Sequence, residues 1–146
     1  MICTPQRLRL AVLVTSSTLV AGLLVAGAPA AGAALPLAGR VVTLDPGHNG
    51  GSAAHPELIN RVVYAGGGVY KACNTVGTAT RRGYSEHAFN WDVANRVAKL
   101  LRAKGARVVF TRSSDTGVGP CVDVRPAIAN RAGSDAVVSI HGDGNF

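Results

Sequence analysis

The chain has 146 residues, of which 47% are hydrophobic and 16% are charged, and its formal net charge is +7. This length fits a single domain. The apolar fraction is too high for an intrinsically disordered chain, and three cysteines are too few for a disulfide-dense mini-protein. The composition therefore indicates an ordinary folded protein.

The first 33 residues have the three-part pattern of a secretory signal peptide. Arg7 and Arg9 precede an apolar run over residues 10–26, and small residues of the kind that signal peptidase recognises follow at 28–33. The alternative is a retained membrane anchor, but a run of about 17 residues is at the short limit for crossing a bilayer. We therefore predict a signal peptide over 1–33, and a secreted or periplasmic protein that associates with the cell wall and keeps no stable membrane anchor.

Removal of this segment changes the charge and the cysteine count. Two basic residues and one cysteine leave with it, so 13 basic and 8 acidic residues remain and the net charge becomes +5. Cys73 and Cys121 remain, and an even pair in an exported protein predicts a disulfide bond. The alternative is a two-cysteine metal site, but the sequence lacks the close C-x-x-C spacing typical of zinc. The sequence lacks basic residues interleaved with aromatic ones, so we exclude nucleic acid as a partner. An anionic cell wall is the simpler partner for the positive charge.

In the rest of the chain, strand signals alternate with helix signals. Runs rich in β-branched residues predict strands at 40–44, 107–111 and 136–141. Helices are predicted over 85–104 and 122–132. Strands that are continuously apolar and alternate with helices are typical of a parallel sheet covered on both faces. We therefore predict an α/β fold, a three-layer sandwich with a mostly parallel central sheet.

The helix over 85–104 is the clearest element. Ser85 is expected to cap its start, and Gly105 is expected to end it. Trp91 is expected in the core rather than on the surface as a stacking platform for sugars. The predicted core face carries five apolar residues at helical spacing: Phe89, Val93, Val97, Leu100 and Leu101.

Residues 49–82 form a long, glycine-rich and irregular segment between the first strand and this helix. Residues 62–64 and 69–70 flank three consecutive glycines, which predicts a small hairpin. Long segments of this kind inside a compact domain are commonly functional.

Three polar residues lie where an α/β sheet places its binding site. His48 follows the first strand, His141 ends the last one, and Glu86 opens the long helix. Two imidazoles and one carboxylate are the ligands of a catalytic zinc, which keeps one position for water. The spacing alone leaves an alternative open, because a histidine after a strand is commonly an ordinary surface residue.

Short motifs occur along the chain in a characteristic order. Residues 45–51 (DPGHNGG), 85–90 (SEHAFN) and 139–143 (SIHGD) carry His48, Glu86 and His141. These motifs resemble those of the zinc-dependent N-acetylmuramoyl-L-alanine amidases of the amidase_3 family, in which the three matching positions are zinc ligands. The resemblance runs from about residue 40 to residue 146, over one catalytic domain. Residues between the motifs follow in the family's order: Thr111-Arg112, Asp115, Arg125, Ala129-Asn130 and Asp135.

The resemblance implies a hydrolase of peptidoglycan. Such an enzyme cleaves the amide between N-acetylmuramic acid and the L-alanine of the stem peptide, using a zinc-activated water. It implies Zn²⁺ as the cofactor, muramyl peptides as the substrate and, we expect, a monomer. Residues near the predicted site have two interpretations each. Asp45 either supports the ligands or only makes a turn, and Arg81-Arg82 either meet substrate carboxylates or lie on the surface. His87 is expected at the rim, and the alternative is that it replaces Glu86 as a ligand.

One part of the family's catalytic set is missing from the matched motifs. In the family a second glutamate, the general base, lies in a strand beyond the Ser-Ile-His motif, and no acidic residue follows Asp143 here. We therefore expect the general base beyond Phe146, in a domain that looks truncated at its C-terminus, so that the chain as given binds zinc poorly and has little or no activity. The alternative function is a catalytically inactive fragment that binds the cell wall.

Overall fold

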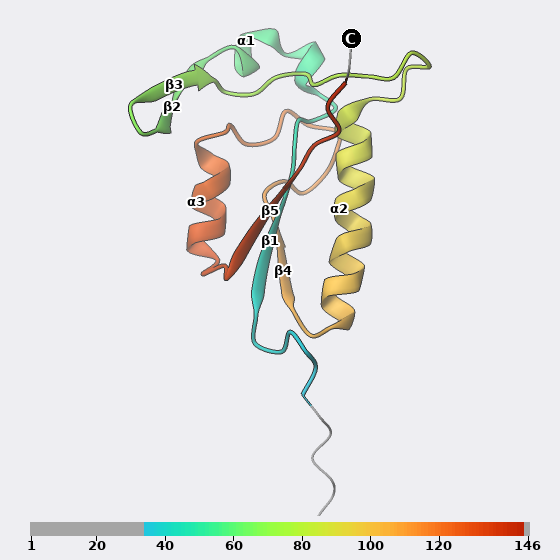
Figure 1. Ribbon diagram of the computed structural model, residues 1–146. Coiled ribbons are helices and arrows are strands. Elements are labelled where there is room, and N and C mark those ends of the chain that lie inside the picture. The colour runs from blue at the N-terminus through green and yellow to red at the C-terminus, as the bar shows by residue number, and fades with distance from the viewer. Residues whose placement is uncertain (1–33, 145–146) are drawn as a thin grey trace, which may run out of the picture. The chain divides into compact units, whose positions relative to one another are not determined.

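The computed structural model describes residues 34–144, so the predicted signal peptide lies outside the described residues. Its centre is a sheet of three strands in the order β4-β1-β5, formed by β1 (Val41–Pro46), β4 (Arg107–Phe110) and β5 (Ala136–Ile140). The central strand pairs in parallel with both neighbours. All three strands therefore end at the same edge of the sheet (Figure 1).

Two helices connect these strands. α2 (Glu86–Ala103) leads from β1 to β4, and α3 (Val124–Arg131) leads from β4 back past β1 to β5. The two crossovers run in opposite directions along the sheet, and right-handed crossovers then put the helices on opposite faces. Figure 1 shows α2 and α3 on either side of the strands. The predicted α/β fold with a parallel central sheet is confirmed.

The core lies between β1 and α2. Val42 and Leu44 of β1 pack against Ala94 and Ala98 of α2, with Ala106 beside them. Small residues at the centre of the helix face let the helix backbone approach the sheet closely. The buried ridge of α2 therefore follows its small residues, with Val97 and Leu101 packed at the margin.

The predicted core face of α2 is partly wrong for this reason. Leu100 is 63% exposed and Phe89 is 38% exposed, whereas the buried residues include Asn90. Ser85 occupies the predicted N-cap position but makes no side-chain cap hydrogen bond. Gly105 ends the helix as expected, with a φ of 93° that a residue with a side chain rarely adopts.

Strand β1 is longer than predicted. Asp45 and Pro46 pair with Ser139 and Ile140 of β5, so the predicted turn begins only at Gly47. This extension carries the parallel pairing of β1 and β5 up to the residue before that turn. It fixes the direction in which the chain leaves the sheet toward His48.

The segment over 49–82 contains more structure than its glycine content predicts. A 3-10 helix η1 (Ser52–Ala54) and a single helical turn α1 (Pro56–Ile59) precede the hairpin. The predicted hairpin is confirmed as the antiparallel pair β2 (Val62–Gly66) and β3 (Val69–Ala72). This segment lies at the carboxyl end of the sheet (Figure 1).

A disulfide bond joins Cys73, directly after β3, to Cys121, shortly before α3. The predicted pairing is therefore present, and the two-cysteine metal site is not. Within residues 34–144, every helix is too short or too polar to cross a membrane.

Candidate metal centre

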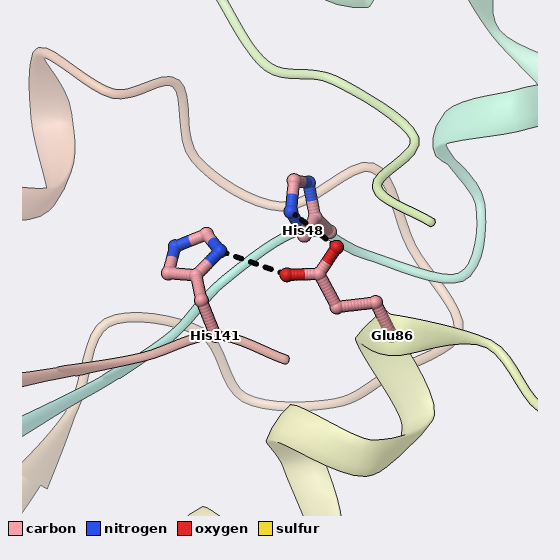
Figure 2. Close-up of side chains that lie close together, drawn as sticks. All are labelled: His48, Glu86 and His141. Carbon is pink, nitrogen blue, oxygen red and sulfur yellow. Dashed lines mark hydrogen bonds and ion pairs between the residues drawn. The ribbon is translucent and has the colours of Figure 1, made fainter. Parts of the chain in front are cut away.

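His48, Glu86 and His141 meet at the carboxyl end of the sheet (Figure 2). His48 follows β1, Glu86 is the first residue of α2, and His141 follows β5. One ligand atom from each residue lies within 4.8 Å of the other two. Glu86 lies between the histidines, with Oε2 3.2 Å from His48 Nε2 and Oε1 3.0 Å from His141 Nδ1. The structure thus brings together all three predicted ligands.

The local backbone makes room for this cluster. His48 has a φ of 59°, which is uncommon for a residue other than glycine and is found mainly at turns and functional sites. At the preceding position, an ideal Cβ on Gly47 would lie 2.7 Å from His141 Nδ1 and closer still to two other ring atoms. Glycine is therefore required at 47 for the imidazole of His141 to sit against the turn.

Glu86 is held as a carboxylate. It is 5% exposed, and burial by itself raises its pKa. Hydrogen bonds outweigh this effect, because the backbone N–H groups of Thr78 and Gly142 donate to its two oxygens and His141 contacts it as well. Together they hold the pKa of Glu86 at about 2. The side chain is therefore ionised at neutral pH, as a metal ligand must be.

His48 is oriented by a carbonyl group. Its Nδ1 lies 2.9 Å from the backbone oxygen of Thr75 and 3.1 Å from the Thr75 hydroxyl. Because a carbonyl oxygen only accepts, Nδ1 carries the proton and Nε2 presents its lone pair toward Glu86. Metal-binding histidines are commonly fixed in this way by a partner on the second ring nitrogen.

The donor set fits a zinc ion. Zinc takes histidine nitrogens and a carboxylate oxygen at about 2.0–2.2 Å, and one such atom from each of the three residues lies within 4.8 Å of the other two. Two neutral imidazoles and one carboxylate leave one coordination position of a four-coordinate zinc open. Such a ligand set is typical of catalytic rather than structural zinc sites.

Asp45 supports the strand that leads to His48. Its Oδ1 accepts hydrogen bonds from Thr111 (2.6 Å) and Arg125 (2.8 Å), and its Oδ2 accepts one from Ser139 (3.1 Å). Burial raises the pKa of Asp45, but these donors more than offset it, so the pKa lies below its ordinary value. Asp45 ties β1 to β5, α3 and the residue after β4. The turn interpretation is wrong.

A second network holds the start of α2. His87 Nδ1 lies 2.8 Å from Asp115 Oδ2, and Arg112 donates to Asp115 Oδ1 and to the carbonyl oxygen of His87. Arg112 is buried, and its guanidinium carbon lies 4.8 Å from the centre of the Trp91 ring. Trp91 therefore packs beneath a cation and is not a free stacking surface. His87 is not one of the three clustered residues, and its contacts with Asp115 and Arg112 fix the start of the helix that carries Glu86.

A cleft of about 630 Å³ opens beside Glu86. Tyr84 and Phe89 contribute aromatic surface, Arg81 a cation, and Asp143 a carboxylate to its lining. Phe89 therefore faces this cleft, contrary to the prediction that it belongs to the core. Of the two arginines at 81–82, Arg81 lines the cleft.

Sequence reasoning missed the residues that orient the ligands. Thr75 and Thr78 reach His48 and Glu86 mainly through backbone atoms, which any residue type supplies. Gly77 lies between them with a φ of 77°. The only signal in the irregular segment was its glycines, any of which could permit close approach of the backbone. The sequence did not distinguish Gly77 from the other glycines of the segment.

The chain matches the family model Amidase_3, described as N-acetylmuramoyl-L-alanine amidase, over residues 42–146. It is similar to the N-acetylmuramoyl-L-alanine amidase Rv3717 of Mycobacterium tuberculosis (strain ATCC 25618 / H37Rv), with 44% identity over 108 residues, which are 74% of this chain and 44% of that protein. It is 34% identical to the N-acetylmuramoyl-L-alanine amidase AmiA of Escherichia coli (strain K12) over 105 residues, which are 72% of this chain and 28% of that protein.

A solved structure agrees with these similarities. The crystal structure of the N-acetylmuramyl-L-alanine amidase Ami1 from Mycobacterium smegmatis superposes with a TM-score of 0.70 and 48% sequence identity, over 75% of this chain and 50% of that one. The chain thus spans about half the length of the mycobacterial relatives.

Proposed function

This chain belongs to the Amidase_3 family of N-acetylmuramoyl-L-alanine amidases. We propose that it carries the zinc site of a peptidoglycan amidase. The bond cleaved is the amide between the lactyl group of N-acetylmuramic acid and the L-alanine of the stem peptide. The observation that carries the proposal is the cluster of His48, Glu86 and His141, whose ligand atoms lie within 4.8 Å of one another at the carboxyl end of the sheet.

The chemistry follows from the donor set. Zinc bound by these residues would supply Lewis-acid polarisation of the amide carbonyl and a water molecule with a pKa near 7. His48 and His141 bind as neutral imidazoles, and Thr75 holds the proton of His48 on Nδ1. Glu86 contributes the negative charge, since its pKa of about 2 keeps it ionised.

By the family's pattern, we propose that the general base belongs to a strand that follows the third ligand. Proton transfer by a positioned base typically contributes 10²–10⁴-fold to the rate. We therefore propose that full activity needs a glutamate general base in addition to the described cluster. The residues described here would supply the ligands of the metal.

The substrate is proposed to lie along the cleft beside Glu86. Tyr84 and Phe89 offer apolar surface for a sugar ring or a side chain, and Arg81 offers a cation to the carboxylates of the stem peptide. The site of action is the cell wall, reached after export under the predicted signal peptide. The enzyme is proposed to act there as a monomer.

The test compares three ligand variants with a histidine control. We expect His48→Ala, Glu86→Ala and His141→Ala each to lose bound zinc together with any hydrolysis of muramyl peptides. His55→Ala should keep both, because His55 is exposed and pairs with Glu57. Release of peptides with L-alanine amino termini from intact glycan identifies the bond.

Two outcomes contradict the proposal differently. Retention of zinc by all three ligand variants overturns the metal site. Zinc binding with retention on peptidoglycan, but without any new L-alanine termini, would favour the inactive wall-binding alternative.

A further inference from the structure

The segment over residues 73–78, here named the strap, contacts two of the three proposed ligands. The Thr75 carbonyl and hydroxyl oxygens lie 2.9 and 3.1 Å from His48 Nδ1. The Thr78 N–H donates to Glu86 Oε2 at 3.0 Å, and the Thr78 carbonyl accepts from the Glu86 N–H at 2.8 Å. The strap therefore fixes the ring of one ligand and the carboxylate of another.

The strap passes close to both side chains at its centre. An ideal Cβ on Gly77 would lie 2.8 Å from Glu86 Oε2 and 2.8 Å from His48 Cδ2. Contacts this short are not tolerated, so the absence of a side chain lets the backbone lie against the cluster. Displacement of the strap would therefore change the positions of His48 and Glu86 together.

The strap is anchored where it begins. Cys73 is 2% exposed and Cys121 is 7% exposed, and their disulfide joins the strap to the segment before α3. The Cys73 carbonyl accepts from the Val122 N–H at 2.8 Å, and the Asn74 side chain donates to the Val118 carbonyl at 3.4 Å. The covalent bond lies two residues from Thr75. It is the one anchor here that a change of redox conditions removes.

We propose that the Cys73–Cys121 disulfide sets the zinc affinity of this site by holding the strap against His48 and Glu86. Oxidation joins the two sulfur atoms, and two electrons and two protons pass to a disulfide oxidant, which becomes a dithiol. The oxidised chain then holds zinc more tightly than the reduced chain does. The inference rests on the proposed function only in taking zinc as the metal.

The main test measures zinc affinity in a chain that cannot form the bond. Loss of partners that orient metal ligands typically weakens metal binding 10–100-fold. We expect Cys73→Ala/Cys121→Ala to bind zinc 10–100-fold more weakly than the oxidised wild-type chain, in competition with a chromophoric chelator. Alanine is used because free thiols would themselves bind zinc. A folded double variant with wild-type affinity would overturn the proposal.

A matched pair of glycine variants tests the strap with the disulfide intact. Gly77→Ala should weaken zinc binding by a similar factor, because its Cβ meets both ligands. Gly83→Ala is the control, because Gly83 also has a positive φ, of 85°, but an added Cβ there meets nothing within 4 Å. Equal affinities of the two variants would show that the strap does not position the ligands.

A further measurement follows the disulfide itself in chains that keep both cysteines. Coupling between two sites is reciprocal, so zinc bound at the cluster must stabilise the disulfide by the same factor by which the disulfide tightens zinc binding. Because free thiols also bind zinc, the thiol–disulfide equilibrium at saturating free zinc is compared between the wild-type chain and His141→Ala, which keeps both thiols but lacks one zinc ligand. The wild-type equilibrium should lie 10–100-fold further toward the disulfide, and equal equilibria or the opposite order contradict the proposal. If the oxidised wild-type chain binds no zinc, the proposed function fails instead.

Discussion

A methyl group added at Gly47 tests whether the turn after β1 is built around His141. In Gly47→Ala the new Cβ would overlap the imidazole, 2.7 Å from Nδ1 and closer to Cε1 and Nε2. Gly47 does not have a positive φ, so the backbone itself accepts alanine. The substitution therefore acts on the ring of His141 rather than on the fold.

The size of the effect follows from these distances. Ordinary van der Waals contact begins near 3.4 Å, so the ring must move by roughly 1 Å. Metal–ligand distances tolerate shifts of only about 0.2 Å. A shift this large removes His141 from the coordination sphere, and we expect zinc affinity to fall by at least 10–100-fold, the range measured when only the outer partners are lost.

The assay is zinc competition against a chelator, with urea unfolding measured in parallel. Gly117→Ala is the matched control, because Gly117 lacks a positive φ and an added Cβ there has only one neighbour, at 3.9 Å. We expect the control to bind zinc like the wild-type chain. Wild-type affinity in Gly47→Ala would refute the assignment of His141 as a ligand held against this turn.

Two further predictions concern the scaffold around the site. Asp45→Asn should cost about 3 kcal/mol at neutral pH, because it leaves the buried Arg125 guanidinium without its carboxylate partner. Since the pKa of Asp45 is lowered in the folded state, its contribution to stability is present above its ordinary pKa of 3.8 and is lost as the pH falls below that value. The free energies of urea unfolding of the wild-type chain and Asp45→Asn should therefore converge below pH 3.8. A gap that stays constant with pH would contradict this. Ala98→Leu should cost about 1–3 kcal/mol by overpacking the contact between α2 and β1. Ala103 is exposed, so the control variant Ala103→Leu should unfold at the same urea concentration as the wild-type chain. Equal loss of stability in Ala98→Leu and Ala103→Leu would show that α2 does not approach the sheet closely at Ala98.

The elements with regular patterns were predictable from the sequence. The β-branched runs gave the three parallel strands, and the helix predicted over 85–104 is α2, Glu86–Ala103. The short elements η1 and α1 were not predictable, because three or four residues carry no periodicity. The side of α2 that faces the sheet was partly misplaced, because close packing selected Ala94 and Ala98 over the larger Leu100.

The candidate site was predictable only in part. His48, Glu86 and His141 are separated by 38 and 55 residues, so no local spacing brings them together, and the family resemblance was needed to select them. The strap left no comparable signal, since Thr75 and Thr78 act through backbone groups. The role of Asp45 depends on donors from β5, from α3 and from the residue after β4, which only the fold assembles.

The central claim is that His48, Glu86 and His141 hold one zinc ion with an open coordination position. Zinc K-edge absorption of the oxidised, zinc-loaded chain tests this most directly. We predict one zinc per chain with nitrogen and oxygen ligands at about 2.0–2.2 Å and no sulfur, and loss of this spectrum in His141→Ala. Sulfur ligands at about 2.3 Å, or the same spectrum in wild type and His141→Ala, would contradict the account.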